Sequence, residues 1–291
     1  TPPMISDLAT LISPSGFGAG IEDWSGVRHD TLESVRFSSR LRRSLAQGGM
    51  VQAKEILWPI DLPGIELSGT LVRLPAIIPI DFIPRADQQR PGPGKRANSI
   101  ADRVAQLDLP ESFILYHGPG DRWNLVQLLQ AWNWAAAAIG ESYPLVVIGL
   151  THQEKDIFFE FVEEYEISDN LRVLPEVKPD LLPYLYQSCT AVFHPAPASP
   201  WCGPVRLALA CGKPLVASEN SITDAIAGPA AYLVSEEDDR ALGAALVTVV
   251  VEEQVAESLS AAAFQRSANW ISPGFGEQLL VRYRKVLGES G

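Results

Sequence analysis

The amino-acid sequence predicts an α/β protein whose larger part is a mostly parallel, doubly wound sheet. From residue 112 onward, short apolar segments of strand length alternate about six times with segments of helical periodicity. The links between them are short, and the apolar segments show no alternation of polar and apolar residues. Strands of this kind are covered on both faces, which is typical of a Rossmann-type sheet flanked by helices.

The predicted elements follow one another in a regular order. They are a strand at 112–117, a helix from 121 to 140, a strand at 145–150, a helix at 152–165, a strand at 171–174, a short helix at 179–188, a strand at 190–193, an apolar helix ending at 211–212, a strand at 214–218, a helix at 221–227, a strand at 231–234 and long helices to the end.

Local signals justify these elements in turn. The first strand, SFILYH, ends at a Gly-Pro-Gly turn, and Asp121 is placed to cap the next helix, where Leu and Trp recur at helical spacing. The segment LVVIGL is a strand covered on both faces. The segment PDLLPYLYQS is a short helix that tolerates proline in its first turn. The strand at 190–193 runs into a loop rich in Pro, Ala and Gly before the apolar helix.

The first part of the chain is less regular. The segment Arg85–Asn98 combines prolines, glycines and charges, which predicts a solvated linker. It divides the chain into a reduced N-terminal, acceptor-side lobe plus linker at 1–97 and a C-terminal Rossmann-like lobe at 98–291. Before it lie a predicted basic helix at Thr31–Ala46 and two strand-like stretches, Ala53–Ile60 and Gly69–Pro79. About 85 residues make only half of an ordinary α/β lobe, so this lobe is either reduced or lacks an upstream portion.

Composition excludes several classes of function. The chain has 291 residues and a net charge of −12, and an acidic surface repels the phosphates of nucleic acids. No apolar run reaches the roughly 20 residues that span a bilayer. The three cysteines and four histidines show no metal-ligand spacing, so we expect no metal and a reduced, cytoplasmic protein. The histidines are His29, His117, His152 and His194, and the cysteines are Cys189, Cys202 and Cys211.

Several motifs occur together in a known order. FILYHGPGDRWNL at 113–125 is followed by DLLPYLY at 180–186, CGKPLVAS at 211–218 and AIAGPAAYLV at 225–234. This series resembles the donor-binding lobe of the retaining family 4 glycosyltransferases, which have the two-lobed GT-B fold. The resemblance runs from about residue 70 to the C-terminus and implies that the last helix returns toward the N-terminal lobe.

The resemblance also implies where a nucleotide-sugar donor would bind. In that family two glutamates bracket the helix after the Pro-rich loop, one near the sugar and one on the ribose. Aligned on the Cys-Gly pair at 211–212, their positions hold Ser199 and Leu207, and no Asp or Glu lies between residues 180 and 219. The phosphate loop retains Gly118 and Arg122, and the remaining donor-binding candidates are Trp201 and Gly203.

These candidates have structural readings as well. Arg122 is either a phosphate ligand or a solvated residue of the first helical turn, and Trp201 is either a sugar platform or a packing residue. His117 and His194, at strand ends, are either buried structural histidines or acid–base groups whose partner the sequence does not identify. Cys202 is either a thiol activated by a helix start or a packed thiol. The helix carrying Arg36 to Arg43 is either a solvated face or a weak membrane contact.

Two functions of different class follow from this. Leucine cannot accept a hydrogen bond from a ribose hydroxyl, and each lost polar contact of this kind costs about 1–3 kcal/mol. We therefore expect no bound cofactor, weak donor affinity and a degenerate glycosyltransferase homologue that acts as a structural or regulatory subunit with other proteins. The alternative is an active retaining glycosyltransferase with a rearranged site, in which Arg122 and amides near Gly203 stabilise the leaving phosphate.

Overall fold

The structure of the chain is a computed structural model. It describes four short strands at 21–22, 28–29, 51–53 and 71–73, residues 78 and 80–84, and most of the chain from 107 to 270. Within that last range, the described residues are 107–118, 122–174, 176–195, 203–235 and 237–270. The fold and the candidate site are described from these residues.

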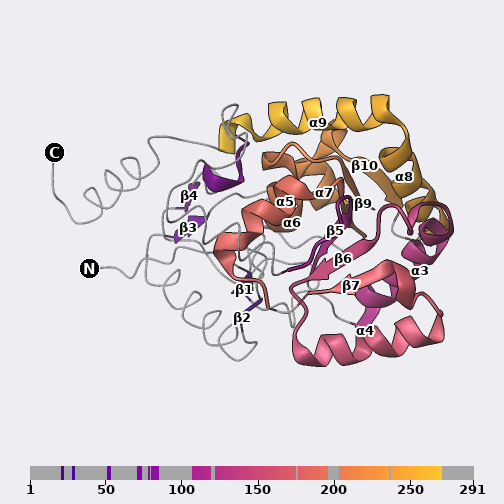
Figure 1. Ribbon diagram of the computed structural model, residues 1–291. Coiled ribbons are helices and arrows are strands. Elements are labelled where there is room, and N and C mark those ends of the chain that lie inside the picture. Colours follow the sequence, from indigo (N-terminus) through magenta and orange to yellow (C-terminus); the bar gives the residue numbers. More distant parts are fainter. Residues whose placement is uncertain are drawn as a thin grey trace, which may run out of the picture.

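A single six-stranded sheet forms the centre of the described region, and all of its strands are parallel (Figure 1). Its strand order is β10-β9-β8-β5-β6-β7. The strands are β5 (Ile114–His117), β6 (Leu145–Ile148), β7 (Leu171–Val173), β8 (Ala191–His194), β9 (Leu215–Glu219) and β10 (Tyr232–Ser235). The predicted α/β class with a Rossmann-type parallel sheet is confirmed.

The strand order contains one reversal of direction. The chain adds β6 and then β7 on one side of β5, and it then crosses to the other side of β5 to place β8, β9 and β10. The reversal separates the carboxyl ends of β5 and β8, where the two connections leave in opposite directions. Ligands of open α/β sheets bind at such a switch point.

Helices connect the strands as the sequence predicts. The helices are α3 (Arg122–Ile139), α4 (His152–Glu164), α5 (Leu182–Ser188), α6 (Gly203–Ala210), α7 (Ser221–Ile226), α8 (Asp239–Val251) and α9 (Glu253–Ser267). Short 3₁₀ turns are η1 (Ile80–Phe82), η2 (Ser168–Asn170), η3 (Pro179–Leu181), η4 (Gly228–Ala230) and η5 (Ala268–Trp270). A capping box between Thr151 and Glu154 fixes the start of α4.

The sheet separates two apolar clusters. Alternate residues of each strand face opposite sides, so Leu115 and Val192 belong to one cluster and Ile114 and Phe193 to the other. The first cluster includes side chains of α5 and α6, and the second includes side chains of α3, α4 and α8. In Figure 1, α3 and α8 lie side by side at one end of the sheet. The strands are thus buried on both faces, as their continuous apolar sequences predict.

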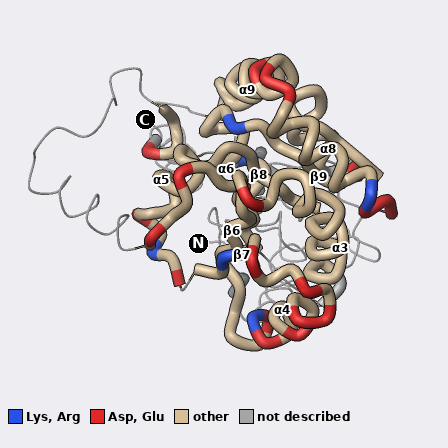
Figure 2. Tube along the Cα trace, turned by 45° about the vertical axis from the view of Figure 1, so that its right-hand side comes forward, with Lys and Arg blue, Asp and Glu red and all other residues tan. Residues whose placement is uncertain are grey.

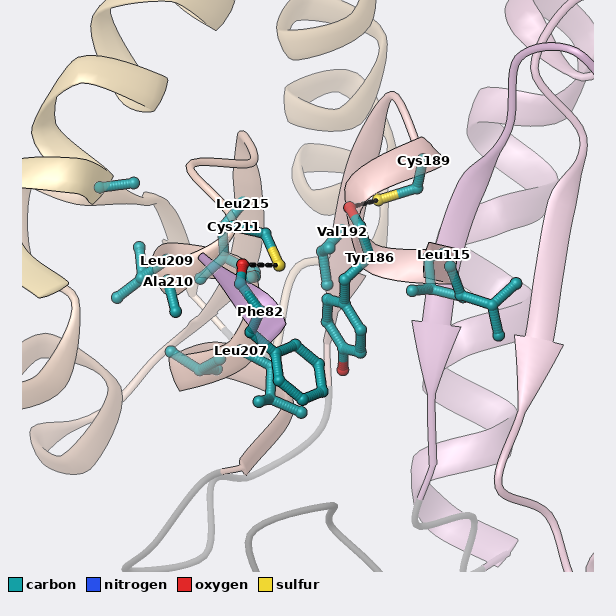
Figure 3. Packing of buried hydrophobic residues seen from close by; sticks show 14 of the residues in the cluster. Phe82, Leu115, Tyr186, Cys189, Val192, Leu207, Leu209, Ala210, Cys211 and Leu215 are labelled. Carbon is teal, nitrogen blue, oxygen red and sulfur yellow. Dashed lines mark hydrogen bonds between the residues drawn. The ribbon is translucent and has the colours of Figure 1, made fainter. Parts of the chain in front are cut away.

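The segment before the linker packs onto the first cluster (Figure 3). Phe82 is fully buried, and its carbonyl oxygen accepts a hydrogen bond from the Cys211 thiol at 3.0 Å. The Gln187 side chain donates to the carbonyl of Asp81 at 2.8 Å. The backbone N–H of Ile78 donates to the carbonyl of Trp270 at 3.4 Å. Ile78, Asp81 and Phe82 are therefore held by η5, by α5 and by the residue that follows α6.

The N-terminal strands differ from the prediction. The strand expected at Ala53–Ile60 lies earlier in the chain, at β3 (Val51–Ala53), and ends where the predicted range begins. It stops directly before the charged pair at 54–55. It pairs in parallel with β4 (Leu71–Arg73), inside the stretch expected at 69–79. The strands β1 (Ile21–Glu22) and β2 (Arg28–His29) form an antiparallel pair that the sequence analysis did not predict.

Some predictions lie outside the described residues. These are the basic helix at 31–46, the linker at 85–98 and the return of the chain after residue 270. The division into domains at 97 and 98 stays a prediction. Within the part of the chain that the structure describes, no helix is both long enough and apolar enough to cross a membrane.

Candidate functional site

Two histidines mark the carboxyl edge of the sheet at the switch point. His117 is the last residue of β5, and His194 is the last residue of β8. The register of these strands pairs Ile114 with Ala191 and Leu115 with Val192. Each histidine lies two residues beyond the last of these pairs, on the same face of the sheet as Leu115 and Val192. The sequence analysis singled out both histidines but did not place them together.

The row that contains these histidines is otherwise apolar. His117 is paired with Ile148 of β6, and His194 is paired with Ala217 of β9. Ile148 and Ala217 both belong to the apolar cluster on the α5–α6 face. Both histidines are only 3% exposed. Each imidazole is thus buried beside an apolar residue of a neighbouring strand at the carboxyl edge of the sheet.

His117 is held from two sides. Its Nδ1 lies 2.8 Å from the hydroxyl oxygen of Tyr186 on α5, and both residues are buried. On the other edge of the ring, a Cβ built on Gly149 would lie 2.9 Å from Cδ2 and 3.3 Å from Nε2. Gly149 has a φ of +81°, a conformation that glycine adopts without strain. The imidazole therefore occupies the space that a side chain at 149 would fill.

His194 is buried to the same extent as His117. Burial lowers the pKa of His194 to about 4, so the ring is neutral at physiological pH. The next residue, Pro195, accepts a hydrogen bond from the buried hydroxyl of Ser218 at 2.5 Å between the oxygens. This bond ties the chain after β8 to the end of β9.

Gly118, the glycine of the predicted phosphate loop, takes part in the hydrogen bonding of the sheet. Gly118 is buried, and its backbone N–H donates to the carbonyl of Ile148 at 2.9 Å. A Cβ at this position would approach the carbonyl oxygen of Gly149 to 3.2 Å. The amide of Gly118 is thus engaged in the β5–β6 ladder. Its predicted contact with a donor stays a prediction.

Helix α6 follows the loop after β8 and is buried along its whole length. Gly203, a predicted donor-binding residue, is its first residue. Leu207, at one of the two expected glutamate positions, is 0% exposed and belongs to the cluster drawn in Figure 3, together with Phe82 and Leu209. The surroundings of this position are therefore those of an apolar core.

A buried arginine stands beside Leu207. Arg206 is 1% exposed, and its guanidinium carbon lies 4.9 Å from the centre of the Trp270 ring, within the range of a cation–π interaction. The backbone of the same helix is tied to α9, because the Ser267 hydroxyl donates to the carbonyl of Leu209 at 3.2 Å. This interaction joins α6 to the end of the described chain.

Other candidates cannot be placed. Ser199, Trp201 and Cys202 lie outside the described residues, as does the side chain of Arg122, whose backbone begins α3. The structure brings His117, Gly118 and His194 to the same edge of the sheet, with Gly203 opening the helix that follows. No group of three or more His, Cys, Asp or Glu side chains within the described ranges could hold a metal ion.

The sequence analysis missed Tyr186, Gly149 and Arg206. The partnership of Tyr186 with His117 joins residues 69 positions apart and has no local signal. A glycine directly after the strand LVVI was such a signal for Gly149. Figure 2 shows acidic residues gathered on α4.

Comparison with known proteins assigns the family. The sequence profile described as "Glycosyl transferases group 1" matches residues 101–266, which is more than half of the chain. The chain belongs to this family. The matched range includes all six strands of the central sheet and helices α3 to α8.

Individual relatives of this group 1 glycosyltransferase chain are distant. It is 26% identical over 152 residues to the O-antigen chain mannosyltransferase B of Escherichia coli, a match that covers 52% of the chain and 40% of that protein. The chain therefore spans well under half of the length of this curated relative.

Solved structures show the same fold. The sucrose-phosphate synthase of Thermosynechococcus elongatus superposes with a TM-score of 0.64 at 19% identity, over 93% of this chain and 65% of that one. The Anabaena protein HepE, solved in complex with UDP and glucose, gives a TM-score of 0.66 at 15% identity, over 97% and 71%. At these identities the likeness establishes the GT-B fold.

Proposed function

We propose that this chain is a glycosyltransferase-like protein of the family 4 type that has lost sugar transfer and acts as a structural or regulatory subunit with other proteins. The observation that carries the proposal is Leu207. It lies fully buried in an apolar cluster at a position where the family 4 resemblance places the glutamate that holds the ribose. An ionised carboxylate there would be desolvated among the apolar side chains of the cluster.

The rest of the loop agrees with this proposal. The position of the other glutamate holds Ser199, and the sequence has no acid between residues 180 and 219 to replace either one. Each lost polar contact to the donor costs about 1–3 kcal/mol, so two such losses weaken binding by orders of magnitude. The low cysteine content supports a reducing, cytoplasmic setting for the assembly.

Turnover of nucleotide sugars tests the proposal directly. The full chain is incubated with UDP-glucose, GDP-mannose and ADP-glucose, and release of the free sugar is measured over hours. We expect no release above the rate without protein, and no saturable heat in the micromolar range on calorimetric titration. In parallel, the chain is expected to purify from its source in a stoichiometric assembly.

The competing function is an active retaining glycosyltransferase, which the family match over the whole of 101–266 favours. In it, Arg122 and the amides near Gly203 stabilise the charge of the leaving phosphate. Micromolar binding of one donor together with its slow hydrolysis would establish that function. The variant Arg122→Gln provides the control, because hydrolysis by this site loses rate in it and hydrolysis by a contaminant does not.

A further inference from the structure

The outer faces of α3 and α8 carry almost no charge. From residue 123 to 139 and from 241 to 251, the sequence has no Asp, Glu, Lys or Arg. On α4, by contrast, Asp156, Glu160 and Glu163 are all exposed. A helix face in contact with water is normally polar or charged. Contact with solvent therefore does not account for the outer surface of α3 and α8.

Large apolar side chains are exposed on this pair of helices. Trp134 of α3 is 56% exposed, and Val251 at the end of α8 is 61% exposed. The two helices lie side by side (Figure 1), and Gly243 of α8 packs against the turn of α3 that carries Trp134. The surface that they form, the α3–α8 patch, consists of Trp134, Ala138, Arg240, Ala244, Val247 and Val251. Within each helix these residues are three or four positions apart, so they share one face, and exposed apolar patches of this kind mark interaction sites.

Trp134 is held in place although more than half of its surface is open. A Cβ on Gly243 would lie 2.6 Å from Cβ of Trp134, so this side chain leaves α3 directly beside α8. The guanidinium carbon of Arg240 lies 5.1 Å from the centre of the Trp134 ring, within the range of a cation–π interaction. Tryptophan and arginine are enriched in the cores of protein interfaces, where Asp, Glu and Lys are depleted. The patch therefore has the composition of a protein-binding surface.

Acidic residues stand at both ends of the patch. Glu237 and Asp238 precede α8, Glu252 and Glu253 follow it, and all four are exposed. Both helices start at the carboxyl edge of the sheet, so the exposed Glu141 beyond α3 lies at the same end as Glu252. A second copy of this chain would place acid against acid in either orientation, and the anionic headgroups of a membrane would be repelled in the same way. The charges instead complement a partner that is basic at both ends of its contact surface.

We infer that the α3–α8 patch is the docking surface for an amphipathic helix of a partner protein, a helix that is apolar on one face and carries Lys or Arg at both ends. From Arg240 to Val251 the patch spans about three helical turns, or about 17 Å, which a helix of about 12 residues covers. This inference rests on the proposed function, because it names the surface through which the subunit joins its assembly.

A peptide of defined chemistry tests the inference with the full chain. The probe is a fluorescein-labelled peptide of about 18 residues, long enough to form a helix, with leucine along one face, lysine at both ends and glutamine elsewhere. One control peptide has glutamate in place of lysine, and another has the same residues in an order that destroys the apolar face. By fluorescence anisotropy we expect saturable binding of the lysine peptide alone, with a dissociation constant below about 100 μM that rises with salt.

Matched variants locate the binding surface. Trp134→Ser is expected to weaken binding of the lysine peptide about tenfold or more, with the circular dichroism of the chain unchanged. Phe159→Ser removes a ring that is 49% exposed on the acidic helix α4, and it is expected to change the affinity less than about twofold. Ala138→Lys and Ala261→Lys add the same charge at exposed helical positions, and only the first, inside the patch, is expected to abolish binding.

Four results would overturn the inference. The lysine peptide may not saturate at all, or Phe159→Ser may weaken its binding as much as Trp134→Ser does. The other two are a dimer of the chain in sedimentation equilibrium that Trp134→Ser dissociates, and binding to vesicles of phosphatidylserine and phosphatidylcholine that the same variant abolishes. Release of free sugar by a chain that binds the peptide through the patch would overturn the proposed function alone, because peptide binding does not depend on turnover of a donor.

Discussion

At the scale of single residues, the burial of His194 links stability to pH. Its pKa is lowered to about 4 by burial, whereas an unfolded histidine titrates near 6.5. Below pH 6.5 the unfolded chain binds a proton that the folded chain does not. Stability is therefore fully present above this pH and is lost as the pH falls toward 4, by about 3 kcal/mol for this group.

The variant His194→Leu tests this linkage, because leucine matches the apolar neighbours in its row. Its free energy of unfolding, measured by urea titration between pH 7.5 and 4.5, is expected to fall less steeply with acid than that of the parent chain. His152→Gln, on the exposed first turn of α4, provides the control and is expected to keep the parent slope. Parallel curves for His194→Leu and the parent chain would contradict the prediction.

Two of the three cysteines are protected by the same effect. Burial raises the pKa of Cys189 to about 12 and that of Cys211 well above its usual range, and each thiol donates to a backbone carbonyl. Thiolate is the reactive form, so neither residue reacts at neutral pH while the chain is folded.

The variant Cys202→Ser leaves these two thiols as the only ones in the chain. We expect no alkylation by iodoacetamide at pH 7.5 within an hour, and two alkylated sites after unfolding in guanidinium, both counted by mass spectrometry. Modification of Cys211 in the native chain would show that the contact of its thiol with the carbonyl of Phe82 opens readily.

At the scale of elements, α3 and α8 approach each other closely at a glycine. A Cβ on Gly243 would lie 2.6 Å from the carbonyl oxygen of Ala131 and 2.6 Å from Cβ of Trp134. Intrinsic helix propensity favours alanine over glycine by about 1 kcal/mol in a helix interior. The short contacts oppose this preference, because the Ala131 carbonyl and the Trp134 Cβ are fixed by the backbone of α3 and cannot move aside as the end of a flexible side chain can.

The variant Gly243→Ala decides between these effects by the sign of the change. We expect a loss of about 1–3 kcal/mol in the free energy of unfolding, since overpacking outweighs the gain in propensity. Ala244→Gly, at the neighbouring exposed position, measures propensity alone and is expected to lose about 1 kcal/mol. A more stable Gly243→Ala chain would mean that the two helices separate at little cost.

Helix α6 is coupled to the 3₁₀ turn η5 through a charged residue. The guanidinium of Arg206 lies over the Trp270 ring in a buried setting, where a cation–π interaction contributes about 2 kcal/mol. A double-mutant cycle of Arg206→Met and Trp270→Leu measures the coupling by urea unfolding. We expect a coupling energy of about 1–2 kcal/mol, and additive effects of the two substitutions would contradict it.

The elements themselves were largely predictable, and their partners were not. The apolar runs and Gly or Pro punctuation predicted every strand from β5 to β10 to within a few residues, because burial on both faces leaves a continuous apolar signal. The segments before residue 78 lack that signal, and there β3 lies ahead of its expected place. The His117–Tyr186 contact and the stacking of Arg206 on Trp270 depend on tertiary approach, which no local pattern encodes.

At the scale of the whole molecule, the sheet divides the described region into two apolar clusters of similar extent. The central strands β5 and β8 are buried on both faces, whereas β10, at one edge, has Tyr232 and Ser235 exposed. The switch point lies between β5 and β8, so the candidate site is built on the most enclosed part of the sheet. A rigid base of this kind holds the two strands that end at His117 and His194.

Hydrogen exchange tests this gradient of stability across the sheet. Amides open locally with free energies that rise from exposed edges to the core, up to the global value. We expect the amides of β5 and β8 to exchange at the slowest rates in the chain, those of β9 to be intermediate, and those of β10 to exchange first, measured by mass spectrometry of labelled peptides. If β10 exchanges as slowly as β5, the six strands open only as one unit. In that case an edge substitution such as Tyr232→Ser would speed the exchange of β5 and β8 amides as much as a core substitution does.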